Sequence, residues 1–348
     1  MKAAIIGLSG LSLTPAEEAM LHTQRPAGVI LFRRNVSDPA QLKALTARLR
    51  SILPSEAALL VDQEGGRVAR LRPPHWRSHP PAAVIGRLYE ADKEAGLRAA
   101  WLTGALIGLD CMGAGFDVVC APVLDLLVPG AHDIVGDRAY GTDPGTVTLL
   151  GGAVMEGLLA AGVRPVMKHV PGHGRAHADS HLELPVVPDE LPAELEPFTR
   201  NAARFAGLPV WAMTAHILYE AWDRLRPATL SPVVIGQIIR QRIGFNGLLV
   251  SDDIAMKALS GDPVSLTRQT LAAGCDVVLH CTGVQAETQA VLEGCPLLTD
   301  QAHTLLAARP VASISIGDGE SLAQERERLG LLEDGIRAKD PTEGHHPA

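Results

Sequence analysis

Several signals that would place a chain in a familiar class are absent from this sequence. Its five cysteines form no CxxC pair, and an odd number spread over 348 residues favours reduced thiols over a disulfide framework or a structural zinc site. No uninterrupted apolar run reaches the roughly 20 residues that a membrane-spanning helix needs. The formal net charge is −8 and the lysines and arginines are scattered, which argues against a nucleic-acid surface. We therefore expect a cytoplasmic enzyme or binding protein that contacts neither nucleic acid nor membrane.

Common cofactor and metal motifs are missing as well. No GxGxxG follows the first apolar run, and the pair Gly65-Gly66 is not followed by the GK[ST] of a phosphate-binding loop. No HExxH is present either. The sequence thus predicts neither a cofactor nor a resident metal.

The chain does contain short apolar runs that recur along its length. They are continuous rather than alternating, which is typical of strands buried on both faces in a parallel sheet covered by helices. The eight predicted strands span residues 3–7, 28–32, 57–62, 116–122, 164–169, 208–216, 247–252 and 276–280. Eight such units without a dinucleotide fingerprint favour a single α/β domain, a (β/α)8 TIM-type barrel over residues 1–338. Residues 339–348 are polar and proline-bearing, and we expect a disordered tail there.

Two helix starts can be predicted from the sequence. Thr14 followed by Pro15 and Glu17 matches a capping box, so the apolar opening is interpreted as a strand leading into a helix rather than a secretory signal. Asp38 followed by Pro39 predicts a capped helix over residues 38–53.

Polar residues gather where the predicted strands end. In a (β/α)8 barrel the catalytic groups lie at that rim. The residues concerned are Asp62, Lys168, His169, His216 and Asp252. We expect them to face one another across the mouth of the barrel.

The stretch KHVPGHGRAHADSH, residues 168–181, is unusually rich in histidine. Its four histidines recur every fourth residue, but proline and glycine break any helix, so the spacing does not predict a metal stripe. We interpret the segment as a mobile loop that carries a catalytic group. Asp179 and His181 lie two apart and would share one side of an extended segment, where the carboxylate can orient the imidazole as an acid and base. A solvated loop with a local hydrogen bond remains the alternative at this point.

Acidic and basic residues at three other loops complete the candidate set. Asp252 and Asp253 end a strand, so one faces the barrel axis as a possible nucleophile while the other caps the next helix. Asp62 is followed by Arg67 and Arg70, a combination suited to bidentate hydrogen bonds with sugar hydroxyls or to a structural ion pair. The segment GDRAYGTDP contributes Arg138 from a similar polar loop.

Taken together these segments resemble bacterial β-N-acetylglucosaminidases of glycoside hydrolase family 3, in particular the single-domain NagZ type that acts in peptidoglycan recycling. The matching motifs occur in order over most of the chain. They are VDQEGGRVAR, GDRAYGTDP, KHVPGHG followed by DSH, AMTAHI and LLVSDDIAM. Departures from the family pattern are Val170, the segment RAHA at 175–178 and LHCTG at 279–283. They spare the chemical positions and affect the loop and the aglycone side.

The resemblance implies a mechanism and a substrate. It implies a retaining, two-step hydrolysis with Asp252 as nucleophile and with His181, assisted by Asp179, as acid/base. The implied binding site for a non-reducing N-acetylglucosamine consists of Asp62, Arg70, Arg138, Lys168 and His169. The implied substrates are muropeptide fragments, GlcNAc-1,6-anhydro-MurNAc with or without peptide. We expect a monomer whose only partner is this carbohydrate.

Other functions stay open on the sequence alone. A family 3 β-glucosidase usually takes its acid/base from a second domain, for which this chain is too short. A barrel lyase would use Lys168 as a Schiff-base amine, and a metal hydrolase would use the loop histidines. A non-catalytic sugar-binding barrel would need no nucleophile at all.

Overall fold

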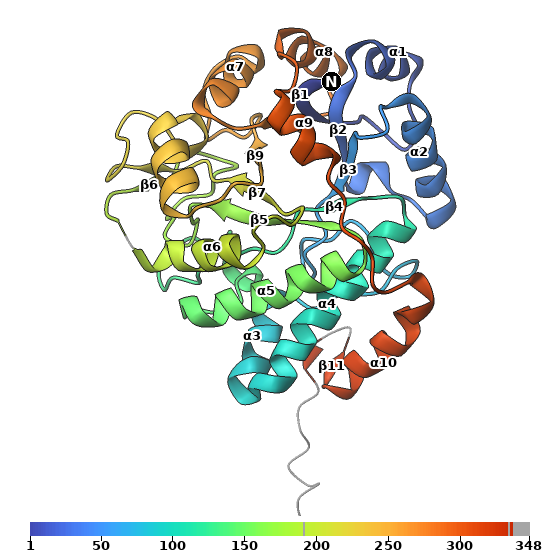
Figure 1. Ribbon diagram of the computed structural model, residues 1–348, viewed down its shortest axis with the longest axis vertical. Helices are drawn as coiled ribbons and strands as arrows, with labels where there is room; N and C mark the ends of the chain where they lie inside the picture. The colour runs from blue at the N-terminus through green and yellow to red at the C-terminus, as the bar shows by residue number, and fades with distance from the viewer. Residues whose placement is uncertain (191, 333–334, 337–348) are drawn as a thin grey trace, which may run out of the picture.

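The predicted barrel is confirmed in the computed structural model, which describes residues 1–190, 192–332 and 335–336 (Figure 1). Eight parallel strands close in the order β1-β10-β9-β7-β5-β4-β3-β2. They are β1 (Lys2–Gly7), β2 (Pro26–Leu31), β3 (Ala58–Val61), β4 (Val118–Val119), β5 (Arg164–Val170), β7 (Trp211–Thr214), β9 (Leu248–Asp253) and β10 (Val277–His280). Each lies in or overlaps one of the eight predicted runs. The predicted domain end at residue 338 and the tail at 339–348 lie outside the described residues.

Helices follow the strands and surround the barrel (Figure 1). The longer ones are α1 (Pro15–Gln24), α2 (Pro39–Ile52), α3 (Ala82–Ala91), α4 (Lys93–Gly113), α5 (Pro144–Ala160), α6 (Pro192–Arg204), the π-helical η4 (Val234–Arg242), α7 (Pro263–Ala273), α8 (Gln285–Gly294), α9 (Asp300–Ala307) and α10 (Gly319–Arg328). Short 3-10 turns are η1 (Arg33–Asn35), η2 (Gly136–Arg138), η3 (Ala228–Leu230) and η5 (Ile316–Asp318). Two small sheets pair β6 (Val186–Val187) with β8 (Leu218–Tyr219) and β11 (Leu331–Leu332) with β12 (Gly335–Ile336).

Both predicted helix starts are confirmed. The Thr14 hydroxyl accepts from the Glu17 N–H at 3.1 Å, and the Glu17 carboxylate accepts from the Thr14 N–H at 2.9 Å. The Asp38 carboxylate accepts from the Gln41 N–H at 2.9 Å. These contacts satisfy backbone donors that a helix leaves unpaired in its first turn.

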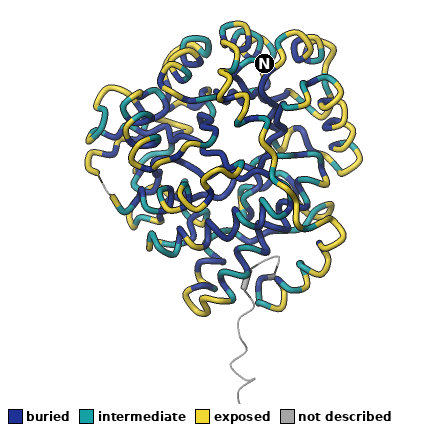
Figure 2. The backbone as a smooth tube through the Cα atoms, in the orientation of Figure 1, coloured by how far each residue is buried: buried dark blue, intermediate teal, exposed yellow. Residues whose placement is uncertain are grey.

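Two apolar cores result from the alternation of side chains along the strands. One lies between the strands and the helices, and the other fills the barrel interior with side chains such as Ile5, Leu60, Val166 and Val250. Leu306 of α9 belongs to the interior core, and its carbonyl accepts from the buried guanidinium of Arg164 at 2.7 Å. The helix α9 therefore closes the amino-terminal end of the barrel, and Figure 2 shows the strands as the buried centre of the molecule. The opposite end is left for the site.

Within the described part of the chain, no helix combines the length and apolar character needed to cross a membrane. All five cysteines lie in that part and are buried with free thiols. Because these five thiols are free, disulfide cross-links between them do not contribute to the stability of the fold.

Candidate functional site

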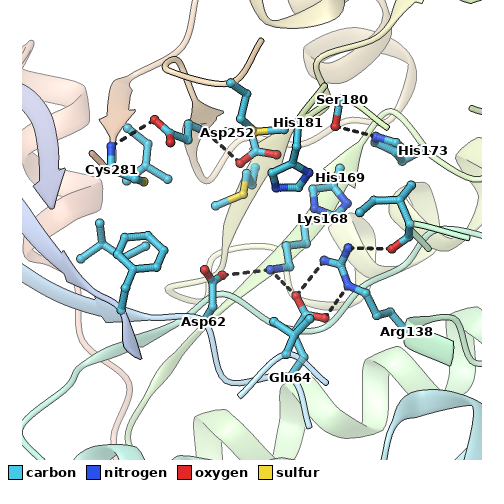
Figure 3. Close-up of a pocket in the computed structure, with 18 of the residues that line it drawn as sticks. Asp62, Glu64, Arg138, Lys168, His169, His173, Ser180, His181, Asp252 and Cys281 are labelled. Carbon is cyan, nitrogen blue, oxygen red and sulfur yellow. Dashed lines mark hydrogen bonds and ion pairs between the residues drawn. The ribbon is translucent and has the colours of Figure 1, made fainter. Parts of the chain in front are cut away.

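A pocket of about 560 Å³ opens at the carboxyl ends of the barrel strands (Figure 3). It is lined by polar residues from six strands or their following loops and by apolar side chains of the barrel interior. The polar and charged lining residues are Arg34, Asp62, Glu64, Arg67, Arg70, Arg138, Lys168, His169, His173, Ser180, His181, Asp252, Asp253 and Thr282. The sequence analysis assigned eight residues to catalysis or sugar binding. Seven of them line this pocket, and the eighth, Asp179, does not.

Strand alternation explains why three of these residues point inward. Lys168 follows Val166 of the interior core by two residues, and Asp252 follows Val250 in the same way. Asp62 likewise continues the inward series of β3 one step beyond the strand. Every second side chain of a strand points into the barrel. The inward-pointing side chains are therefore apolar along the strands and charged at the carboxyl ends of the strands.

These charges form a connected ion-pair cluster. The Lys168 ammonium lies 3.2 Å from a carboxylate oxygen of Asp62 and 2.6 Å from one of Glu64. Arg138 donates to both oxygens of Glu64 at 2.8 and 2.9 Å, and Arg70 donates to Asp62 at 3.1 Å. The cluster therefore fixes both carboxylates at the floor of the pocket.

The cluster settles the protonation of its members. Burial alone would lower the pKa of Lys168, but Glu64 and Asp62 outweigh it, so its pKa lies above the ordinary lysine value. Burial would raise the pKa of Glu64, but Arg138 and Lys168 hold it well below its usual range. An ammonium held between two carboxylates lacks the free lone pair that a Schiff-base amine needs. This environment argues against the lyase alternative.

Asp252 presents a carboxylate to the same pocket. One of its oxygens accepts from the Asp253 N–H at 2.8 Å, which orients the group. Burial alone would raise the pKa of Asp252, but His216, His169, the Asp253 N–H and Lys168 together bring it below the usual value. Asp252 is thus an ionised carboxylate, the form that acts as a nucleophile.

Asp253 differs from the expectation that it caps a helix. Its carboxylate accepts from the N–H groups of Ala255 and Cys281, both at 3.0 Å. The segment after it forms turns, and α7 begins only at Pro263 with Asp262 as its cap. Asp253 therefore holds the loop after β9 to the end of β10, because the polypeptide turns back over the strand ends before the next helix.

Asp179 and His181 do form a pair, but not in an extended segment. One Asp179 oxygen accepts from the His181 N–H and from its Nδ1, each at 2.8 Å. The Asp179 carbonyl also accepts from the N–H of Leu182 at 2.8 Å, so the triplet forms a turn. The pair orients the imidazole with Nδ1 toward Asp179 and leaves Nε2 available to the pocket. The His181 side chain is 59% exposed, so its ring is accessible at the pocket mouth.

A buried carboxylate supports the other two pocket histidines. Asp125 accepts from His169 Nδ1 at 2.7 Å and from the His173 N–H at 2.7 Å. The rings of His169 and His173 meet edge to face with centroids 5.6 Å apart. Burial first, and then His169, lowers the pKa of His173 to about 4. His173 is therefore neutral near pH 7.

The four loop histidines do not converge on a common point. His169 contacts Asp125, His173 contacts Ser180, His177 contacts the Gly130 carbonyl, and His181 contacts Asp179. Among the described residues no group of three or more His, Cys, Asp or Glu side chains is arranged to hold a metal ion. The geometry gives the metal-hydrolase alternative no support.

The structure brings several of the predicted residues together at the rim, and it adds others that the sequence analysis did not name. The sequence analysis grouped Arg67 with Asp62 as a candidate for sugar binding or for an ion pair. In the structure Arg67 pairs with Asp137 at 3.0 Å and donates to the carbonyls of residues 133–135. Glu64 and Asp125 were missed. Glu64 lies two residues after Asp62 and Asp125 follows the fourth strand, so their positions offered a signal. Their partners, however, are more than 40 residues away in sequence, as in the His169–Asp125 pair.

Comparison with known proteins gives a consistent result. The family model described as the glycosyl hydrolase family 3 N terminal domain matches residues 6–303. The beta-hexosaminidase of Aromatoleum aromaticum is 38% identical over 284 residues, covering 80% of this chain and 78% of that protein. The beta-hexosaminidase of Alkalilimnicola ehrlichii is 38% identical over 317 residues, covering 88% of this chain and 89% of that protein.

Solved structures agree with these relatives. NagZ from Neisseria gonorrhoeae, crystallised in complex with N-trifluoroacetyl-D-glucosamine, superposes with a TM-score of 0.85 at 29% identity. The match covers 94% of this chain and 97% of that chain. A family 3 β-N-acetylglucosaminidase from Paenibacillus matches with a TM-score of 0.77, covering 98% of this chain and 64% of that larger chain.

Proposed function

The chain belongs to glycoside hydrolase family 3 as a β-N-acetylhexosaminidase, and from that premise we propose that it removes N-acetylglucosamine from peptidoglycan fragments. The substrates proposed are GlcNAc-1,6-anhydro-MurNAc disaccharides with or without peptide. The reaction proposed is a retaining hydrolysis through a glycosyl-enzyme on Asp252.

One observation carries the mechanistic part of the proposal. An ionised carboxylate on β9 and an imidazole on the loop after β5 line the same pocket (Figure 3). Most retaining glycosidases use two carboxyl groups about 5 to 5.5 Å apart. Here the pair Asp179–His181 takes the place of the second carboxyl group, because its imidazole has a basic nitrogen free to carry a proton.

In the first step Asp252 attacks the anomeric carbon. A bond forms between its carboxylate oxygen and C1 while the bond from C1 to the leaving oxygen breaks. His181, protonated at Nε2, gives that proton to the leaving oxygen. Asp179 accepts from Nδ1 and thereby holds the ring so that Nε2 faces the leaving oxygen.

In the second step water displaces Asp252 from C1. His181, now neutral, takes a proton from the water as its oxygen attacks C1, and the ester to Asp252 breaks. Two displacements at C1 return the β configuration. The enzyme ends with Asp252 ionised and His181 protonated, as it began.

The floor of the pocket suits the hydroxyl groups of a terminal sugar. Asp62 offers acceptor oxygens, while Arg70, Lys168 and Arg138 offer donors, and His169 adds a ring nitrogen. Lys168 and Arg138 already pair with Asp62 and Glu64, so they suit the neutral hydroxyl groups of the terminal sugar better than an acidic aglycone. We therefore assign them to the terminal sugar alone.

We further propose that the protein works as a monomer in the cytoplasm. Support for that compartment comes from the five free thiols, which remain reduced there. One copy of the chain supplies both Asp252 and His181, the two groups proposed to carry the reaction.

Comparing three substrates tests the proposed specificity. We expect rapid hydrolysis of an aryl N-acetyl-β-glucosaminide and of the anhydro-disaccharide. The aryl β-glucoside should react more than about 100-fold more slowly in kcat/KM, because groups that bind the acetamido substituent would be left unpaired. Equal rates on glucoside and N-acetylglucosaminide, or no turnover of the anhydro-disaccharide, would contradict the proposal.

A further inference from the structure

The loop that carries His181 is fastened at its tip by the residue immediately before it. Ser180 is buried, although the next side chain, His181, is mostly exposed. The Ser180 hydroxyl lies 3.2 Å from Nε2 of His173, and its carbonyl accepts from the N–H of Ala258 at 3.1 Å. One residue thus contacts both the base of its own loop, through the Ser180–His173 contact drawn in Figure 3, and the loop that follows Asp252.

His173 is held rigidly enough to serve as the fixed side of this contact. Its backbone N–H donates to buried Asp125 at 2.7 Å, and the preceding Gly172 carbonyl accepts from the Tyr219 hydroxyl. Its ring is buried against His169. Within the described part of the chain its Nδ1 has no hydrogen-bond partner, so Ser180 is the polar contact of this ring.

The Ala258 contact joins the loop that carries His181 to the loop that follows Asp252. Ala258 lies in the turns after β9, six residues beyond Asp252. The N–H of Ala258 is a backbone donor that the Ser180 carbonyl satisfies in this position. Docking of the Ser180 carbonyl therefore places the imidazole-bearing turn against the carboxylate-bearing loop.

We propose that Ser180 is a positioning residue that clasps the His181 loop over the pocket, with His173 and the Ala258 N–H as its two anchors. The proposal rests on the proposed acid/base role of His181. Ser180 need not touch the reacting atoms, since it acts by raising the fraction of time that His181 faces the leaving oxygen. A buried neutral hydrogen bond is worth about 0.5–1.5 kcal/mol, so its loss shifts that fraction by about 2- to 10-fold.

The test compares Ser180→Ala with wild type on two aryl N-acetyl-β-glucosaminides. The 2,4-dinitrophenyl leaving group departs without a proton, whereas the phenyl leaving group needs one. We expect kcat/KM to fall about 2- to 10-fold for the phenyl substrate and to stay unchanged for the dinitrophenyl substrate. Azide, which attacks the glycosyl-enzyme without a general base, should restore any loss of kcat on the dinitrophenyl substrate.

Ser231→Ala is the matched control. Ser231 is also buried, and its hydroxyl donates to Asp223 at 2.7 Å outside the pocket lining. This variant should lose stability without any split between the two substrates. A second measurement uses a double-mutant cycle, because Ser180→Ala should add little to His173→Phe if the hydroxyl acts through that ring.

His181→Ala separates failure of the clasp from failure of the proposed function. If His181→Ala shows the leaving-group split and Ser180→Ala shows none, the clasp is wrong and the acid/base role stands. An equal loss on both substrates in Ser180→Ala would also overturn the clasp. If His181→Ala shows no split, the acid/base role is wrong and the clasp is overturned with it.

Discussion

Asp252 and His181 have different roles, and their replacement should separate them. Asp252→Asn removes the attacking carboxylate, so hydrolysis of both natural disaccharides and activated aryl glycosides should be abolished. General acid/base catalysis contributes about 10² to 10⁴ in rate, and its acid part matters little for a good leaving group. His181→Ala should therefore harm the disaccharide far more than an activated aryl glycoside. Steady-state kinetics on both substrates checks this, and equal modest losses in the two variants would contradict the assignment.

Glu64 should matter for both stability and substrate binding. Its carboxylate is buried between Arg138 and Lys168, so Glu64→Gln leaves two buried cations short of a counter-charge. Breaking a buried ion pair in this way costs about 3–5 kcal/mol, and KM should rise as the pocket floor loses its geometry. Urea unfolding and steady-state kinetics measure the two effects.

An exposed pair provides the control for Glu64. Glu18→Gln breaks a surface ion pair with Arg48, whose side chain is 54% exposed. Such pairs contribute little in water, so neither stability nor KM should change measurably. If Glu64→Gln behaved like Glu18→Gln, the cluster would have no structural importance.

At the scale of elements, the positions of the strands could be predicted from the sequence. The conformations of the loops that follow the strands could not. Residues 58, 60 and 62 alternate inward, so the position of Asp62 at the rim follows from the sequence. The Asp179–His181 contact was also predictable because the two residues are neighbours. The turn that joins them and the turns after Asp253 were not, because contacts with distant segments decide those conformations. One such contact is the hydrogen bond from Cys281 to Asp253.

Helices α4 and α5 pack closely through glycine, which gives an element-scale prediction. A Cβ on Gly157 would lie 2.2 Å from the Trp101 carbonyl oxygen, which is backbone and cannot move aside easily. Gly157→Ala should therefore destabilise the protein by about 1–3 kcal/mol through overpacking. Outside its chain neighbours and the backbone of its own helix, Gly236 in η4 has no described atom within 4 Å of such a Cβ, so Gly236→Ala should be neutral or stabilising by up to about 1 kcal/mol. Urea unfolding of both variants checks the contrast, and a Gly157→Ala protein as stable as wild type would refute the close contact.

For the whole molecule, buried histidines predict how stability depends on pH. Burial lowers the pKa of His79, His173, His216 and His280, so the folded state binds fewer protons than the unfolded state. Their contribution is complete above the unfolded value of about 6.5 and is lost as pH falls toward the folded values. With a folded pKa of about 4, His173 alone should cost roughly 1.4 kcal/mol between pH 7.5 and 5.5.

Urea unfolding at several pH values measures this dependence. The free energy of unfolding should fall steadily from pH 7.5 to 5.5. Asp253 and Glu194 act in the opposite direction, because burial raises their pKa values, but carboxyl groups ordinarily titrate near pH 4, below the histidines. Stability that stays constant or rises over this range would contradict neutral buried histidines.

Covalent trapping tests the proposed chemistry of the barrel most directly. The protein is incubated with a fluorinated N-acetylglucosaminyl fluoride, which forms the glycosyl-enzyme quickly and releases it slowly, and is then digested for peptide mapping. We predict one added sugar per chain, attached to Asp252, and release of the β anomer from the normal substrate. A label on any other side chain, or release of the α anomer, would contradict nucleophilic attack by Asp252.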